Sequence, residues 1–185
     1  NASCTTNSIG PVMAVLNEKF GIEKAMMSTI HGYTADQNLQ DGPHKDLRRA
    51  RAAAENIVPT STGAAMATTE VIANLSGVFD GLAFRVPVPT VSLSDMTVLL
   101  KKNVTKEEVN KAMVDASKTE RFAGVLTTTN EPLVSSDFIG NTHSAIVDLN
   151  LTNVVGGNLV KVVAWYDNET GYANRLVELA ELYSS

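Results

Sequence analysis

Hydrophobic residues recur at two spacings along this chain, and each spacing predicts one kind of element. At helical spacing, apolar side chains follow one another over residues 7–20 and again over residues 172–183. Gly21 is the residue expected to end the first of these helices. The sequence Thr-Lys-Glu-Glu that begins at Thr105 is typical of a capping box and predicts another helix over residues 105–117.

Strands are predicted where apolar residues alternate with polar ones or form short runs. The run 25–31 is one such segment, and the alternation over residues 82–100 predicts two more strands. Pro87 and Pro89 restrict these two strands to an edge or mark the break between them. Further strands are expected at 123–128, 144–150 and 158–166, with a hairpin turn at Gly156-Gly157.

Between these elements lie a polar loop over residues 33–48, an Ala- and Arg-rich helix over 48–55, a turn at 60–63 and a helix over 64–75. Strands follow one another without intervening helices in the second half of the chain. A doubly wound nucleotide fold would instead alternate strand and helix throughout. The order therefore predicts an α+β fold, with a mostly antiparallel or mixed sheet and helices on one face.

Composition excludes several classes of protein. The 185 residues are 44% hydrophobic and 19% charged, which is ordinary for one globular domain. The net charge of -5 and the lack of a basic stripe argue against a nucleic-acid partner. No apolar run can span a bilayer, and no signal peptide is recognisable. A single cysteine forms no internal disulfide, which fits a cytoplasmic location.

Cys4, that single cysteine, is the first candidate for chemistry. It lies among hydroxyl and amide residues, just before the expected helix N-cap at Asn7 or Ser8. The positive end of a helix dipole stabilises a thiolate and lowers the pKa of the thiol. The alternative is a structural cysteine in the core, but polar neighbours are unusual for such a residue. We therefore expect Cys4 to be a nucleophile.

Histidine is the side chain most often used to take a proton from a thiol. His31 ends a predicted strand, from which its ring can reach a cleft, whereas His44 and His143 lie in loops. Spacing by itself does not choose among the three. One cysteine and three scattered histidines provide no metal-ligand spacing, and no GxGxxG motif is present.

Possible anion sites form a second group of candidates. Hydroxyl residues surround Cys4 and recur at Thr34 and at Thr60-Ser61-Thr62-Gly63, twice directly before a predicted helix. Ordinary helix capping is the alternative explanation for each cluster taken alone. Arg85 lies among apolar residues of a predicted strand and needs an anionic partner, either a phosphate or a carboxylate.

Taken together, these segments resemble the phosphorylating glyceraldehyde-3-phosphate dehydrogenases. The resemblance covers essentially the whole chain and follows the family's order of motifs. It departs from the family pattern at Ser8, Met66 and Thr170, where a Cys, a Lys and a Trp are usual. The matching segments are 2–7 (ASCTTN), 31–37 (HGYTADQ), 62–65 (TGAA), 84–87 (FRVP) and 165–169 (WYDNE).

The resemblance implies a role for each matching residue. Cys4 would attack the aldehyde, and His31 would act as its acid and base. Thr34 and Arg85 would bind the phosphate of the substrate. The remaining assignments are an attacking-phosphate site of Ser3, Thr5, Thr62 and Gly63, and a nicotinamide site of Asn168 and Tyr172.

The resemblance also implies the surroundings of this domain. Residues 1–169 would form the catalytic domain, and 170–185 a helix that packs on an N-terminal NAD-binding domain absent from this chain. The chain opens on Asn1 without a starting Met, and we expect a piece of a longer protein that is inactive alone. The implied partners are glyceraldehyde 3-phosphate, inorganic phosphate and NAD, in a cytoplasmic homotetramer.

Three alternatives stay open at this point. A sister enzyme that oxidises erythrose 4-phosphate shares the cysteine and the histidine. A non-catalytic assembly module would need neither residue. The cofactor could be NADP rather than NAD, although Gly42-Pro43, in the loop from Asp36 to Arg51, favours NAD by resemblance. The same loop resembles one that reaches the cofactor site of a neighbouring subunit.

Overall fold

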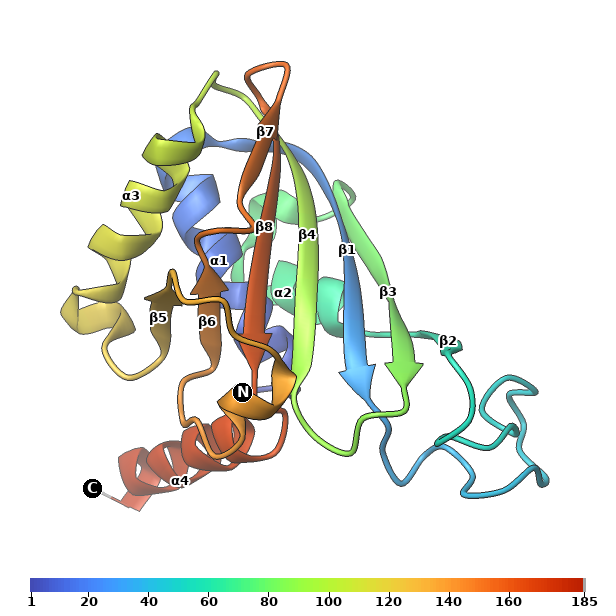
Figure 1. Ribbon diagram of the computed structural model, residues 1–185. Helices are drawn as coiled ribbons and strands as arrows, with labels where there is room; N and C mark the ends of the chain where they lie inside the picture. Colours follow the sequence, from blue (N-terminus) through green and yellow to red (C-terminus); the bar gives the residue numbers. More distant parts are fainter. Residues whose placement is uncertain (185) are drawn as a thin grey trace.

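The computed structural model describes residues 1–184, which form a mixed sheet with helices packed against one face (Figure 1). Ser185, the last residue of the expected tail helix, lies outside the described residues. The helices are α1 (Cys4–Phe20), α2 (Ala64–Val71), α3 (Lys106–Ser117) and α4 (Thr170–Ser184), with short 3-10 turns η1 (Ala73–Leu75), η2 (Glu120–Phe122) and η3 (Ser135–Phe138). The strands are β1 (Ile22–Gly32), β2 (Val58–Ser61), β3 (Phe79–Val86), β4 (Ser92–Leu100), β5 (Leu126–Thr129), β6 (Ala145–Asp148), β7 (Asn153–Val155) and β8 (Leu159–Tyr166).

Parallel and antiparallel pairs both occur in the sheet, which confirms the predicted α+β class. The strand order is β2-β3-β1-β4-β8-β6-β5, and β7 pairs with β8 as the hairpin expected at the two glycines. Strand β1 runs antiparallel to β4 and parallel to β3, and β5 runs parallel to β6. Helices α1 and α2 lie behind the sheet in Figure 1, and α3 lies to its left beside β5. The core forms between these helices and the sheet.

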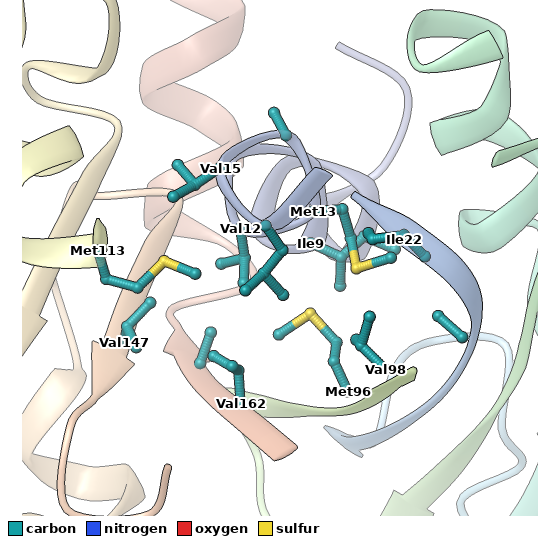
Figure 2. Packing of buried hydrophobic residues seen from close by; sticks show 14 of the residues in the cluster. Ile9, Val12, Met13, Val15, Ile22, Met96, Val98, Met113, Val147 and Val162 are labelled. Carbon is teal, nitrogen blue, oxygen red and sulfur yellow. The ribbon is translucent and has the colours of Figure 1, made fainter. Parts of the chain in front are cut away.

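Helix α1 contributes the centre of the core. Ile9, Val12 and Met13 are fully buried, and they meet Met96 of β4 and Val162 of β8 (Figure 2). The helical spacing read from the sequence is therefore the spacing of buried positions. The helix begins three residues earlier than predicted, because the Ser3 hydroxyl caps it by accepting the Thr6 amide hydrogen at 3.0 Å.

Three sequence predictions between residues 48 and 75 differ from the structure. Residues 48–55 form turns rather than a helix, because their backbone groups bond across the loop. The Asp41 carboxylate accepts the Ala52 amide hydrogen at 2.8 Å, and the Ala53 amide hydrogen bonds the Asn38 carbonyl at 3.0 Å. The predicted turn at 60–63 begins inside β2, which pairs with β3. The helix predicted over residues 64–75 stops at Val71, before η1.

The opposite face of the sheet carries apolar side chains that no element among residues 1–184 covers. Met26 is 65% exposed, and it lines one cavity of about 1060 Å³ together with Leu99 and Leu159. No helix in the described part of the chain is long and apolar enough to span a membrane. The expected helix over 172–183 is confirmed as α4, which starts two residues earlier and buries only Gly171.

Candidate functional site

The first residue of α1 meets the C-terminal end of β1, an interior strand of the sheet. Cys4 Sγ lies 3.4 Å from His31 Nε2, within the reach of a sulfur hydrogen bond. In the parallel register of β1 and β3, His31 stands opposite Arg85. The helix start and the two strand ends therefore bring a thiol, an imidazole and a guanidinium together from three distant segments.

These groups surround one cavity of about 290 Å³. The cavity brings together all the residues to which the resemblance gives a role, except Thr5, Thr62 and Gly63. It is lined by Ala2, Ser3, Cys4, His31, Thr34, Arg85, Asn168, Glu169 and Tyr172. Of the three exceptions, Thr5 is 4% exposed, Thr62 lines a separate cavity, and Gly63 caps α2. The alternative histidines His44 and His143 do not line it.

Burial decides the electrostatics of the reactive pair. Loss of solvent raises the pKa of the Cys4 thiol, although a hydrogen bond from Thr5 and the charge of Arg85 act in the opposite direction. The sequence predicted a lowered pKa for Cys4, and that prediction is wrong for residues 1–184 because burial outweighs the helix start. Burial and then the Arg85 charge lower the pKa of His31 to about 4. Both side chains are therefore neutral at pH 7.

The neighbours of His31 Nδ1 are one acceptor and one donor. Nδ1 lies 2.7 Å from the Gly32 carbonyl oxygen, which can only accept a hydrogen, and 2.5 Å from Arg85 Nη1, which can only donate one. Arg85 Nη1 also donates to the Gly32 oxygen at 3.2 Å, so its charge borders the ring directly. A role as base toward Cys4 requires the tautomer that carries its proton on Nδ1, which leaves the Nε2 lone pair facing Sγ.

Tyr166, at the end of β8, is a site residue that the sequence reasoning did not identify. Its hydroxyl lies 2.9 Å from Thr5 Oγ1 and 2.8 Å from Thr29 Oγ1, and its ring meets His31 edge-on with centroids 6.0 Å apart. Burial raises the pKa of Tyr166 to about 12, so the hydroxyl stays protonated. Tyr166 lies within the matching segment 165–169, but the sequence assigned a role there only to Asn168.

Two residues of the loop after β1 were also missed. Gln37 is 6% exposed, and its Oε1 accepts both the amide hydrogen and the hydroxyl hydrogen of Thr34. Arg49 donates from Nε to Thr60 Oγ1 at 2.6 Å. Burial lowers the pKa of Arg85, and the charge of Arg49 acts in the same direction. The one available signal was the density of polar residues in the long loop, which does not distinguish among them.

Asn168 presents its amide to the cavity from the segment that joins β8 to α4. Its Oδ1 accepts the Ser92 hydroxyl hydrogen at 3.1 Å, and its Nδ2 donates to Glu169 Oε1 at 3.3 Å. An amide donor beside Tyr172 suits a neutral ring that bears a carbonyl, such as nicotinamide. The cavity matches one end of a dinucleotide in size, and the chain has no glycine-rich phosphate loop for the rest.

A metal centre finds no support in the described residues. Residues 1–184 contain no group of three or more His, Cys, Asp or Glu side chains that could hold an ion. The chemistry available at the cavity is therefore nucleophilic attack by sulfur, proton transfer by imidazole, and anion binding by Arg85 with hydroxyl and backbone donors.

Comparisons with known proteins point to one family. Residues 3–168 match the family model described as the glyceraldehyde 3-phosphate dehydrogenase C-terminal domain. Among curated relatives, glyceraldehyde-3-phosphate dehydrogenase of Mycobacterium avium is 57% identical over 98% of this chain and 53% of its own length. That of Geobacillus stearothermophilus is 54% identical over 100% of this chain and 55% of its own. The chain thus spans about half the length of the curated relatives it matches.

Proposed function

Because this chain belongs to the glyceraldehyde 3-phosphate dehydrogenase family and matches its C-terminal domain, we propose that the full protein oxidises glyceraldehyde 3-phosphate. The product is 1,3-bisphosphoglycerate, and the reaction is the NAD-dependent, phosphorylating step of glycolysis. One observation carries the proposal: Cys4 Sγ lies 3.4 Å from His31 Nε2 in a cavity that Arg85 also lines.

Cys4 acts as the nucleophile and His31 as its base. Sγ attacks the aldehyde carbon while Nε2 takes the thiol proton, because both groups are neutral beforehand. The imidazolium returns this proton to the oxygen of the attacked carbonyl, so the product is a thiohemiacetal on Cys4 and His31 is neutral again. His31 then takes the hydroxyl proton of this intermediate as it is oxidised to a thioester. NAD, when bound, supplies the hydride acceptor.

The thioester on Cys4 conserves the energy of oxidation for the second half of the reaction. Inorganic phosphate attacks the thioester carbon, the acyl phosphate leaves, and Cys4 becomes free again. We propose that Thr34 and Arg85 hold the phosphate of the substrate, since both line the cavity around Cys4. The attacking phosphate is assigned to Ser3, Thr5, Thr62 and Gly63, close to the N-terminal ends of α1 and α2.

Asn168 and Tyr172 form the proposed nicotinamide site, and an upstream domain binds the rest of NAD. Residues 1–169 form the proposed catalytic domain, and 170–185 the helix that packs on the upstream domain. The exposed apolar surface of α4 supports this packing, because Leu176 is 50%, Val177 58% and Tyr183 85% exposed.

The full protein is proposed to be a homotetramer that acts in the cytoplasm, where glycolysis takes place. The uncovered apolar face around Met26 and Leu159 supports assembly, because large exposed apolar patches mark interfaces. The loop from Asp36 to Arg51 is proposed to reach the cofactor site of a neighbour. Its exposed Leu39 and Leu47 are consistent with such a contact.

Spectrophotometry of the full-length protein tests this function. We expect NADH to form with glyceraldehyde 3-phosphate and inorganic phosphate, faster than with erythrose 4-phosphate. We also expect the 185-residue chain alone to produce little or no NADH, because it supplies only one wall of the cofactor site. Faster turnover of erythrose 4-phosphate, or no turnover by the full-length protein, would contradict the proposal.

A further inference from the structure

Ser92, the first residue of β4, connects the catalytic histidine strand to the amide of Asn168. Its side chain is 2% exposed, and its oxygen accepts the Gly32 amide hydrogen at 3.2 Å. Its hydroxyl hydrogen points to Asn168 Oδ1 at 3.1 Å. A serine hydroxyl has one hydrogen to donate, and here that hydrogen is committed to Asn168.

This bond determines which way round the Asn168 amide lies. With Oδ1 held by Ser92, Nδ2 is turned toward the other side, where it donates to Glu169 Oε1 at 3.3 Å. The flipped amide would place Oδ1 against the Glu169 carboxylate, so that two acceptors would face each other. It would also leave the Ser92 hydrogen without an acceptor at this contact. Both neighbours therefore favour the same orientation.

The backbone before Ser92 is strained in a way that serves this contact. Val91 has a φ of 72°, in the left-handed region that β-branched residues rarely adopt. It is held there by burial, since it is 2% exposed and packs in one cluster with Phe138 and Ile146. Strain of this kind persists where the surroundings determine it, and it is often found at functional sites.

Gly32 shows how closely the turn before Ser92 approaches the end of β1. A Cβ at Gly32 would lie 2.9 Å from the Val88 carbonyl oxygen, and that same oxygen accepts the Tyr33 amide hydrogen at 3.1 Å. The turn therefore packs directly against the backbone of Gly32, where a side chain would not fit. This close fit places Ser92 between Gly32 and Asn168.

We propose that Ser92 is a positioning residue for cofactor recognition, which holds Asn168 so that its Nδ2 donor faces the cavity. The inference rests on the proposed function and deepens it. An amide held in this way selects a ring substituent that offers a carbonyl acceptor. Ser92 acts through Asn168, while the strained Val91 turn keeps the hydroxyl in place.

Equilibrium binding of NAD to the full-length protein, measured by isothermal titration calorimetry, tests this assignment. We expect Ser92→Ala to raise the dissociation constant roughly threefold to tenfold, because one oriented hydrogen bond loses its support. Ser92→Thr keeps the hydroxyl and should bind like the unmodified protein. Ser144→Ala is the matched control, since that serine is 3% exposed and its hydroxyl has no hydrogen-bond partner among residues 1–184.

The double variant Ser92→Ala/Asn168→Ala shows whether Ser92 acts through Asn168. It should bind NAD no more weakly than Asn168→Ala alone. Fully additive losses, or a Ser92→Ala variant that binds as tightly as the Ser144→Ala control, would overturn the assignment. If the unmodified protein itself neither binds nor reduces NAD, the proposed function fails as well.

A second variant keeps the inference testable if Ser92→Ala does not fold. Asn168→Asp retains the acceptor for Ser92 but offers the cavity an oxygen in place of Nδ2. We expect NAD binding at least as weak as in Asn168→Ala, because no donor then faces the ring. Binding by Asn168→Asp equal to that of the unmodified protein would exclude an oriented donor.

Discussion

At the scale of single residues, the neutral pair of Cys4 and His31 determines how the chemistry starts. Burial holds the thiol protonated and keeps the imidazole free of its second proton, so neither charge exists before the substrate arrives. With Nε2 at 3.4 Å from Sγ, proton transfer can accompany attack. In the proposed reaction, His31 is therefore needed in each turnover rather than only to prepare a thiolate.

Replacement of the base tests this view. We expect His31→Gln in the full-length protein to lower kcat about 10²- to 10⁴-fold, with a smaller change in KM for the aldehyde, because general-base assistance acts in the transition state. His143→Gln, outside the cavity, serves as the control. Stopped-flow measurement of NADH formation gives both constants, and an unchanged kcat in His31→Gln would exclude the assigned role.

His31 also links stability to pH. Its pKa is about 4 in the fold and about 6.5 in an unfolded chain, so the unfolded state binds the proton first as pH falls. The stability that the neutral ring contributes is therefore complete above pH 6.5 and declines toward pH 4. Between pH 6.5 and pH 5 this loss amounts to about 2 kcal/mol, at 1.36 kcal/mol per pH unit.

Urea denaturation at pH 7 and at pH 5 measures that loss. The His31→Gln variant should lose about 2 kcal/mol less between the two conditions than the unmodified chain, because its side chain does not titrate. His143→Gln should reduce this pH-dependent loss of unfolding free energy by less than His31→Gln does, since His143 is only half-buried. Equal pH dependence in the unmodified chain and His31→Gln would contradict the assigned pKa.

At the scale of elements, a single carboxylate secures the start of α4. Asp167 is 3% exposed, and it accepts the amide hydrogens of Glu169 and Thr170 at 2.9 Å and that of Gly140 at 2.8 Å. These bonds lower the pKa of Asp167 even though burial acts in the opposite direction. The same residue therefore anchors the segment that carries Asn168.

We expect Asp167→Ala to reduce the free energy of unfolding by about 1–3 kcal/mol, because a helix cap and a buried loop contact disappear together. The lowered pKa means that the contribution is present above about pH 4 and is lost as pH falls further. Urea denaturation at pH 7 measures the loss. Glu181→Ala, an exposed acid of α4, is the control, and an equal effect of both changes would refute the capping role.

At the scale of the whole molecule, the two faces of the sheet differ in what covers them. Helices cover one face, whereas Met26, Leu99 and Leu159 line an open cavity on the other. A proposed tetramer would bury this face. The isolated domain thus has a well-buried core on one face of the sheet and an exposed apolar surface suited to assembly on the other.

A charge on that surface should weaken assembly. We expect Met26→Glu in the full-length protein to shift the tetramer toward smaller species, because a carboxylate buried at an apolar interface loses its solvation. Met26→Leu, which keeps the side chain apolar, is the control. Sedimentation velocity measures the distribution, and an unchanged tetramer in Met26→Glu would show that this face is not the interface.

The sequence by itself determined the helices and strands with strong periodicity, such as α1 and β4, because each pattern depends on neighbours within a few residues. From residue types and motifs, it also identified Cys4 and His31 as candidate reactive residues and Arg85 as a candidate anion-binding residue. Only the tertiary structure decided that residues 48–55 form turns, because the deciding hydrogen bonds come from Asp41 and Asn38.

Tertiary contacts decided the rest of the site as well. The pKa of Cys4 depends on burial by segments far along the chain, and local sequence describes only the helix start. Tyr166 lies in a motif that was interpreted only for Asn168, and Ser92 lies in none of the matching motifs. The importance of both residues comes from the hydroxyl contacts that packing gives them. Periodicity and residue type are local properties, whereas proximity, desolvation and hydrogen-bond direction exist only after distant segments have met.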